Sequence, residues 1–185
     1  TIVENNGRDD EQEGISGAGI ILCGGDNTVR NSVVRGNRGG WGAGILSRGG
    51  EGTLLLQDSR IEDNTCYVDS CHGAGLTLFS EEKILTENLI SGNRIDYGYG
   101  WGGGVFTTGA QGVTRMSHNI ICDNYAPSYG GAVFADGTTL FMSHDLVYHN
   151  RAGDSGGAGV AADEEYEAPA HVHLTNCTIA HNTSD

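Results

Sequence analysis

An asparagine returns at the same point of a repeated phrase seven times along this chain. The seven positions are Asn6, Asn37, Asn64, Asn93, Asn124, Asn150 and Asn182. Subtracting neighbouring residue numbers gives gaps of 31, 27, 29, 31, 26 and 32 residues. A period of this size is typical of one supersecondary unit stacked on copies of itself, and it constrains the fold more than any other feature of the sequence.

Apolar and small residues recur at fixed spacings from the asparagine. The residue three positions before it is Val or Ile in all seven repeats, and the residue eight positions before it is Val, Leu or Met in six. A phrase of three small residues and an aliphatic residue, such as Gly73 to Leu76, also occurs six times. Short alternating runs bounded by Gly, Asn and Asp are typical of strands, and 31 glycines in 185 residues argue against helices.

These columns predict an all-β fold, a single-stranded parallel β-helix (solenoid) of about six coils, with three short strands per coil wound around an apolar centre. Each strand would pair with its counterpart one coil away. The asparagine tolerates a left-handed turn and can bond backbone groups of its own and adjacent coils, so the column is predicted to be an asparagine ladder with a structural role.

The repeat runs from Thr1 to Asn182, so we expect residues 1–185 to form a single β-helix domain. No capping segment precedes the first asparagine or follows the last. An uncapped β-helix exposes strand edges and an open core. We therefore expect either a segment of a longer chain or a subunit that associates end to end with other copies.

The chain is strongly acidic, with 10 basic and 24 acidic residues and a formal net charge of −14. This charge disfavours nucleic acid and anionic membrane surfaces as partners. No apolar run approaches the roughly 20 residues of a membrane span, so no membrane insertion is expected. The composition suits an extracellular or cell-surface protein with a cation-binding surface.

The five cysteines do not form a C-x-x-C pair, which disfavours a zinc ribbon. Cys66 and Cys71 bracket four residues of one loop between strands, and a disulfide that closes this loop is one expectation. The alternative, which stays open for Cys122 and Cys177 above all, is a buried free thiol.

Aromatic residues recur in the variable loops between each asparagine and the next small-residue phrase. The residue immediately before the small phrase is Trp41, His72, Trp101 and Tyr129 in four successive repeats, and Tyr97 and Tyr99 lie nearby. Loops on a rigid scaffold often carry function. These six residues are candidates for binding an extended glycan, because aromatic rings stack on sugar faces. In the alternative interpretation the rings fold over and cover the small residues beneath them.

A second polar column stands six residues before the asparagine, and by strand alternation we expect it to face solvent. Three of its members, Glu87, His118 and His144, would be vertical neighbours about 5 Å apart. Imidazole and carboxylate groups at that spacing are candidates for a transition-metal site or for acid–base chemistry. The alternative is a solvated polar face.

Two acidic clusters lie in long loops, one at residues 9–13 and one at residues 163–167. Oxygen-rich loops can bind calcium, which is therefore a candidate cofactor. Neither cluster matches an EF-hand or a calcium-binding nonapeptide repeat, and solvated loops are the alternative.

The phrase from Ser59 to Asn64, followed by the phrase from Gly73 to Leu76, resembles the repeats of right-handed parallel β-helix proteins of bacterial surfaces. Those repeats alternate a G-G-[GA]-[IV] phrase with an S-x-I-x-x-N phrase. The phrase from Gly130 to Val133 is also similar to the G-G-A-[ILV] half of polymorphic outer-membrane adhesin repeats. The resemblance implies a right-handed, pectin-lyase-like helix. It also implies a non-catalytic role as an adhesin or as a filament or coat component.

The same fold hosts pectate lyases and polygalacturonases, so a polysaccharide lyase or glycoside hydrolase is the alternative function. A pectate-lyase-like site needs several calcium-binding carboxylates beside an arginine base. Asp69 and Asp96 with Arg94, on neighbouring loops, are the closest set and are the candidate catalytic residues.

Overall fold

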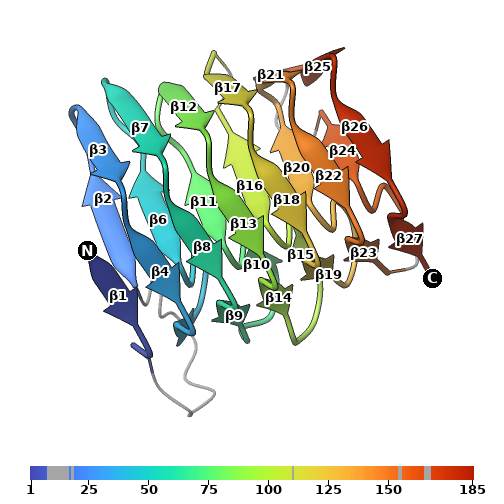
Figure 1. Cartoon of the computed structure of the whole chain (residues 1–185), viewed down its shortest axis with the longest axis horizontal. Helices are drawn as coiled ribbons and strands as arrows, with labels where there is room; N and C mark the ends of the chain where they lie inside the picture. Colours follow the sequence, from blue (N-terminus) through green and yellow to red (C-terminus); the bar gives the residue numbers. More distant parts are fainter. Residues whose placement is uncertain (8–16, 18, 110, 154–155, 165–167) are drawn as a thin grey trace.

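The computed structural model describes residues 1–7, 17, 19–109, 111–153, 156–164 and 168–185. All regular structure in these residues is β, and no helix among them is long and apolar enough to cross a bilayer. Stacked coils follow one another along the long axis of the molecule, with the two ends of the chain at opposite ends of the stack (Figure 1). The prediction of a parallel β-solenoid of about six turns is confirmed.

The strands form four long sheets and one short one. Sheet A contains β1 (Ile2–Glu4), β4 (Val33–Arg35), β8 (Arg60–Glu62), β13 (Leu89–Ser91), β18 (Ile120–Cys122), β22 (Leu146–Tyr148) and β26 (Thr178–Ala180). Sheet B contains β5 (Arg38–Gly39), β9 (Thr65–Cys66), β14 (Arg94–Ile95), β19 (Tyr125–Ala126), β23 (Arg151–Ala152) and β27 (Thr183–Ser184). Sheet C contains β2 (Ile20–Cys23), β6 (Ile45–Arg48), β11 (Leu76–Leu78), β16 (Val105–Thr108), β20 (Val133–Asp136) and β24 (Val160–Asp163).

Sheet D contains β3 (Asn27–Arg30), β7 (Thr53–Gln57), β12 (Glu82–Thr86), β17 (Val113–Ser117), β21 (Thr139–Ser143) and β25 (His171–Thr175), and sheet E contains β10 (Cys71–His72) and β15 (Gly100–Trp101). Within each sheet the strands pair in parallel with their counterparts on adjacent coils; β12, for example, lies between β7 and β17. The prediction of three strands per coil was wrong, because a typical coil also has a short strand in sheet B. The strands of that sheet have two residues each, too few to show an alternating pattern.

The core consists of aliphatic columns inside the coil. Leu56, Leu85 and Met116, from the column eight residues before the asparagine, pair in register and are 0–1 % exposed. The small-residue phrase lets coils approach closely: a Cβ added at Gly75 would lie 2.5 Å from the backbone oxygen of Gly104. These contacts explain why aliphatic and small residues alternate with the polar loops.

The asparagine ladder is confirmed. The backbone N–H and the Nδ2 of each of the first six asparagines donate to Oδ1 of the asparagine on the next coil, at 2.9–3.1 Å. From the second asparagine onward, Nδ2 also donates to a backbone carbonyl of the preceding coil, at 2.9–3.3 Å. The asparagines of the middle coils are 0–1 % exposed. The ladder therefore supplies polar partners where the chain turns inside the solenoid.

A second ladder, which the sequence analysis missed, stands five residues before the first. Its members are Ser32, Ser59, Asn88, Asn119 and Asp145, all at most 8 % exposed. The backbone N–H of each of the first four donates to a side-chain oxygen on the next coil, at 2.8–3.2 Å. Asp145 ends this row: its Oδ1 accepts from Asn119 N and Nδ2, and its Oδ2 accepts from Ser143 N at 3.1 Å.

The predicted disulfide between Cys66 and Cys71 is present, and both residues are fully buried. It closes the loop that follows β9, with Ile95 and Ala126 packed beside it. The other three cysteines are free; Cys122 is buried, as the alternative interpretation allowed.

Candidate functional site

The outer face of sheet C is covered by a strip of rings, here called the aromatic strip: Trp41, His72, Trp101 and Tyr129. The register of the short strands brings them together, because His72 of β10 pairs with Trp101 of β15, and Trp101 forms a parallel bridge with Tyr129. The sequence prediction that these four residues share one register on successive coils is therefore correct. What they bind is a separate question.

Three of the four rings of the strip, those of Trp41, His72 and Trp101, contact one another directly. Trp41 stacks on His72 with ring centroids 4.4 Å apart and an interplanar angle of 16°. His72 also meets Trp101 edge-on at 4.9 Å and stacks on Phe106 at 4.4 Å. Contacts of this kind add about 0.5–1.5 kcal/mol each beyond the buried area. The first three rings therefore form one packed surface, and the Tyr129 ring lies instead beside Phe134, with ring centroids 6.1 Å apart.

Part of each ring serves to cover the sheet beneath. Leu46, Thr77, Phe106 and Phe134 occupy the outward positions of four neighbouring strands of sheet C, yet all are at most 3 % exposed. These buried side chains account for the inner faces of the rings, and the alternative interpretation, that the rings cover the small residues beneath them, stays a prediction. Sequence analysis missed Phe106 and Phe134, although each directly follows the aliphatic residue of the small-residue phrase.

The outer edges of the strip stay accessible. Trp41, His72 and Trp101 are half-buried, and Tyr129 is 36 % exposed. The Nε1–H of Trp41 donates to the backbone oxygen of Ser70 at 2.9 Å, which fixes this ring against the disulfide-closed loop. Such an arrangement, rigid and amphipathic, is suited to stacking on the face of a sugar ring.

His72 is held in its neutral form. Burial lowers the pKa of this imidazole from 6.5 to about 4, and its Nδ1 is buried without a hydrogen-bond partner. An aromatic enclosure cannot solvate an imidazolium, so the uncharged ring is favoured. His72 therefore acts at neutral pH as a flat, uncharged ring that continues the strip between Trp41 and Phe106.

Replacing His72 by phenylalanine is expected to make the protein less sensitive to acid. Between pH 6.5 and about 4 the unfolded chain binds a proton at this imidazole and the folded chain does not, so the free energy of unfolding of the native protein falls as the pH falls through that window. His72→Phe removes this contribution. Urea unfolding at several pH values would measure the difference, with His181→Phe, at an exposed site, as the control. Parallel pH profiles for the native and His72→Phe proteins would contradict the expectation.

Tyr97 and Tyr99 lie in the loop between β14 and β15 and are 61 % and 70 % exposed. They are the most exposed of the six predicted glycan-binding residues. The carbonyl of Tyr99 accepts a hydrogen bond from Cys71 N at 2.9 Å, so the backbone of this loop is tied to the coil that carries His72.

The three candidate catalytic residues lie on neighbouring coils, with two of them in contact. Arg94 Nε donates to Asp96 Oδ1 within one loop, and the Arg94 guanidinium lies 5.0 Å from the centroid of the Tyr125 ring. Asp69 Oδ1 instead accepts from Ser70 N at 3.1 Å and lies against Gly98 of the next loop. The Arg94 guanidinium therefore already has a carboxylate partner and a ring contact, and within the described structure Asp69 forms no hydrogen bond with either of the other two candidates.

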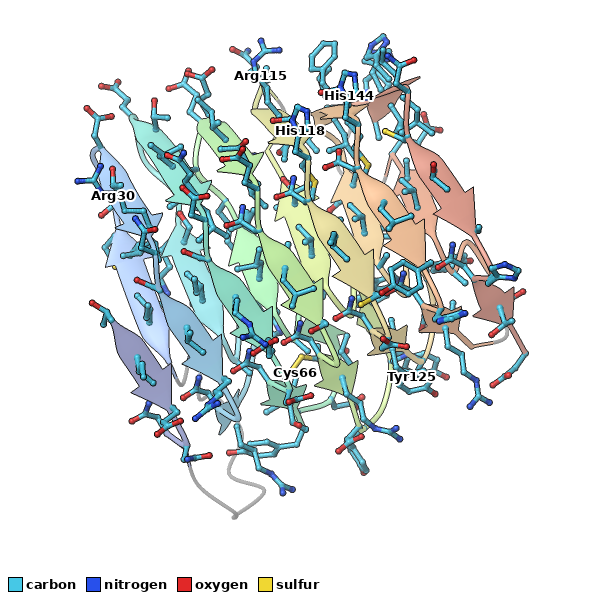
Figure 2. All side chains as sticks on the ribbon, in the orientation of Figure 1. Arg30, Cys66, Arg115, His118, Tyr125 and His144 are labelled. Carbon is cyan, nitrogen blue, oxygen red and sulfur yellow. A yellow bond between two sulfur atoms is a disulfide. The ribbon has the colours of Figure 1, made fainter. Side chains whose placement is uncertain are left out.

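The predicted metal residues lie on the corner between sheets D and A. His118 and His144 are stacked in parallel, with ring centroids 4.9 Å apart and an interplanar angle of 2° (Figure 2). In parallel imidazoles the in-plane nitrogen lone pairs do not converge on one point. The described residues contain no group of three or more His, Cys, Asp or Glu side chains placed to hold a metal ion, and Glu87 does not complete one with this pair.

The acidic loops belong only in part to the described structure. The cluster at residues 9–13 and residues 165–167 of the second cluster lie outside the described residues. In the second cluster Asp163 Oδ1 accepts a hydrogen bond from Glu164 N at 2.8 Å. Calcium binding at these loops stays a prediction.

Together, fold and surface define a class: a parallel β-solenoid with two internal side-chain ladders and a half-exposed aromatic strip on one outer sheet. No family model, curated protein or solved structure matches this chain.

Proposed function

We propose that this chain is a non-catalytic extracellular β-helix scaffold, an adhesin or a filament or coat component, that contacts glycans through the aromatic strip. The observation that carries the proposal is the row of part-exposed rings on four successive coils, in which Trp41, His72 and Trp101 contact one another and Tyr129 follows in backbone register. One ring per coil gives a repeat of about 4.8 Å. A regular ladder of rings suits a regular polymer better than a single small molecule.

The surroundings of the strip favour an extended, uncharged glycan. The formal net charge of −14 repels polyanions, so polyuronates would need calcium to bridge them to the protein. The disulfide next to Trp41 supports an extracellular location, since such bonds persist in oxidising compartments. These points agree with the resemblance to β-helix proteins of bacterial surfaces with a pectin-lyase-like fold, which belongs to this proposal.

The experiment is a binding survey with neutral glycans and polyuronates, with and without calcium, by affinity electrophoresis. For a glycan that binds, Trp101→Ala is expected to weaken the affinity about tenfold or more, as loss of a central aromatic anchor does. Tyr129→Ala and Tyr99→Ala should weaken it less, because they lie at the margin of the strip or beyond it. Phe141→Ala is the matched control, since this ring lies on the outer face of sheet D, stacked on His173.

Each outcome of the survey decides something. Binding that Phe141→Ala leaves unchanged and Trp101→Ala reduces supports the proposal. No binding to any glycan, or equal binding by native and Trp101→Ala proteins, overturns the glycan contact. Reproducible chain cleavage or an unsaturated product, lost in Arg94→Ala, would replace the scaffold by the lyase or hydrolase alternative.

A further inference from the structure

A column of six polar residues runs along the corner between sheets D and A, here called the corner column. In chain order its members are Asn31, Asp58, Glu87, His118, His144 and Asn176. All six are exposed, and all six have positive φ values, between 48° and 58°. Non-glycine residues rarely adopt this conformation. Its recurrence at each of these corners turns the six side chains outward, and after the first five of them the next residue is a member of the second ladder and turns inward.

The column has a fixed pitch. The residues on both sides of it pair in register from coil to coil; Thr86 with Ser117 on one side and Leu89 with Ile120 on the other are examples. The His118 and His144 rings are 4.9 Å apart, which is one coil. Asp58 and Glu87 lie on adjacent coils as well, so the carboxylate pair and the imidazole pair have the same spacing.

The corner column is complementary to its own reverse: when the order of its groups is reversed, each carboxylate lies opposite an imidazole and each amide opposite an amide. It reads amide, carboxylate, carboxylate, imidazole, imidazole, amide. If a second copy is turned end over end about an axis between Glu87 and His118, then Glu87 faces His118 of the copy and Asp58 faces His144 of the copy. The amides of Asn31 and Asn176 then face each other. A two-fold contact requires such a self-complementary surface.

We propose that the corner column is the contact edge between two antiparallel copies of this chain, held by carboxylate–imidazole pairs across a two-fold axis.

The neighbouring columns fit the same axis. At the centre, Leu89 of one copy lies opposite Ile120 of the other, and Ile120 is 41 % exposed in the single chain. On the sheet D side, the outward residues nearest the axis are Thr86 and Ser117, whose hydroxyls carry no charge. Neither flank places like charges opposite one another beside the axis. The contact would be small, so we expect a weak association that depends on charge.

Protonation of the histidines controls the contact. Imidazoles as a class gain their charge near pH 6.5, whereas carboxylates keep theirs down to about pH 4. Within the same chain, Glu87 stands one coil from His118 in the column, and the buried carboxyl of Asp145 also acts electrostatically on that residue. The amide of Asn176 lies 3.3 Å from His144 Nε2, and Arg115 and His173 lie on the outer face of sheet D. Association should therefore be strongest in mildly acidic solution and weaken toward alkaline pH.

The test is sedimentation velocity of the 185-residue chain at about pH 5.5 and about pH 8, in dilute and in concentrated sodium chloride. The native chain should form dimers at the lower pH, and concentrated salt should dissociate them. Two double variants break the pairing. His118→Glu with His144→Asp makes all four ionisable positions of the column acidic, and Asp58→His with Glu87→His makes all four imidazole.

Each double variant alone should be a monomer, and an equal mixture of the two should form a heterodimer. The quadruple variant, which carries all four substitutions and restores the net charge, should dimerise as the native chain does. Only residue types already present at this column are introduced, so the fold should tolerate them. Glu51→His with Glu81→His, at exposed sites off the column, is the control and should keep the native dimer.

A native chain that stays monomeric under all four conditions overturns the proposal. So does dimerisation of either double variant alone to the native extent, which would place the contact elsewhere on the surface. The glycan survey does not bear on either result, since the corner column and the aromatic strip occupy different sheets.

Discussion

Replacing Asn93 by alanine is expected to lower the free energy of unfolding by about 4 kcal/mol. Asn93 is fully buried at the middle of the first ladder. Its Oδ1 accepts from the backbone N–H and the Nδ2 of Asn64, at 3.1 and 2.9 Å, and its Nδ2 donates to Asn124 Oδ1 and to the backbone oxygen of Ile61, both at 2.9 Å. Alanine leaves these partners unpaired away from water.

Urea denaturation followed by circular dichroism would measure this loss. The matched control is Asn182→Ala on the last ladder position, which is half-buried and can draw on solvent. Asn182 still accepts from Asn150 and donates to the backbone oxygen of Val147, so its loss should cost about 1 kcal/mol. Equal effects of the two substitutions would show that burial in the ladder adds nothing to a surface hydrogen bond.

Replacing Lys83 by methionine is expected to raise the free energy of unfolding at neutral pH by about 2 kcal/mol. Lys83 is the only lysine of the chain, and it is 0 % exposed inside the coil, in register between Leu54 and Thr114. Its Nζ donates to the backbone oxygen of Thr108 at 2.8 Å. Burial lowers the pKa of this amine from 10.5 to about 8, which corresponds to about 3 kcal/mol against the charged form. The lost hydrogen bond offsets about 1 kcal/mol of the gain.

The pH dependence provides a second readout for Lys83. Between pH about 8 and 10.5 the unfolded chain holds the proton and the folded chain has lost it, so the free energy of unfolding of the native protein rises with pH across this window. The Lys83→Met protein should lack that rise. Arg115→Met, an exposed substitution on sheet D, serves as the control. A native protein whose stability is flat between pH 8 and 10.5 would contradict the assignment.

Much of the fold could be predicted from columns that repeat with the coil. Three columns show this: the asparagine, the aliphatic residue three positions before it and the small-residue phrase. Each has the same structural role in every coil, so the same residue types recur at a fixed position in the sequence. The second ladder escaped notice because serine, asparagine and aspartate share its positions. A side-chain oxygen is all that this row needs to accept from the preceding coil, and several residue types supply it.

The candidate site could be predicted from the sequence less completely than the fold. Counting from the asparagine placed Trp41, His72, Trp101 and Tyr129 in one row, but it could not show that Phe106 lies under His72, because that contact joins strands of two different sheets, β16 and β10. The corner column was expected to be exposed through strand alternation. It is exposed because its backbone turns left-handed at the corner, which residue type alone does not reveal. Lys83 stands in an inward column, in register between Leu54 and Thr114. The sequence analysis overlooked it because it is a single charged residue in that column.

The direction of the ladders has an electrostatic consequence. In both rows each amide donates one Nδ2–H to the next coil and accepts at its oxygen from the previous one, so the dipoles of these side chains add along the axis as peptide dipoles do in a helix. Paired strands contribute little net dipole of their own. The side chains thus give this solenoid a positive pole toward its C-terminal coils. Asp145, with its carboxylate at the N–H end of the second row, is placed like an anion at the N-terminus of a helix.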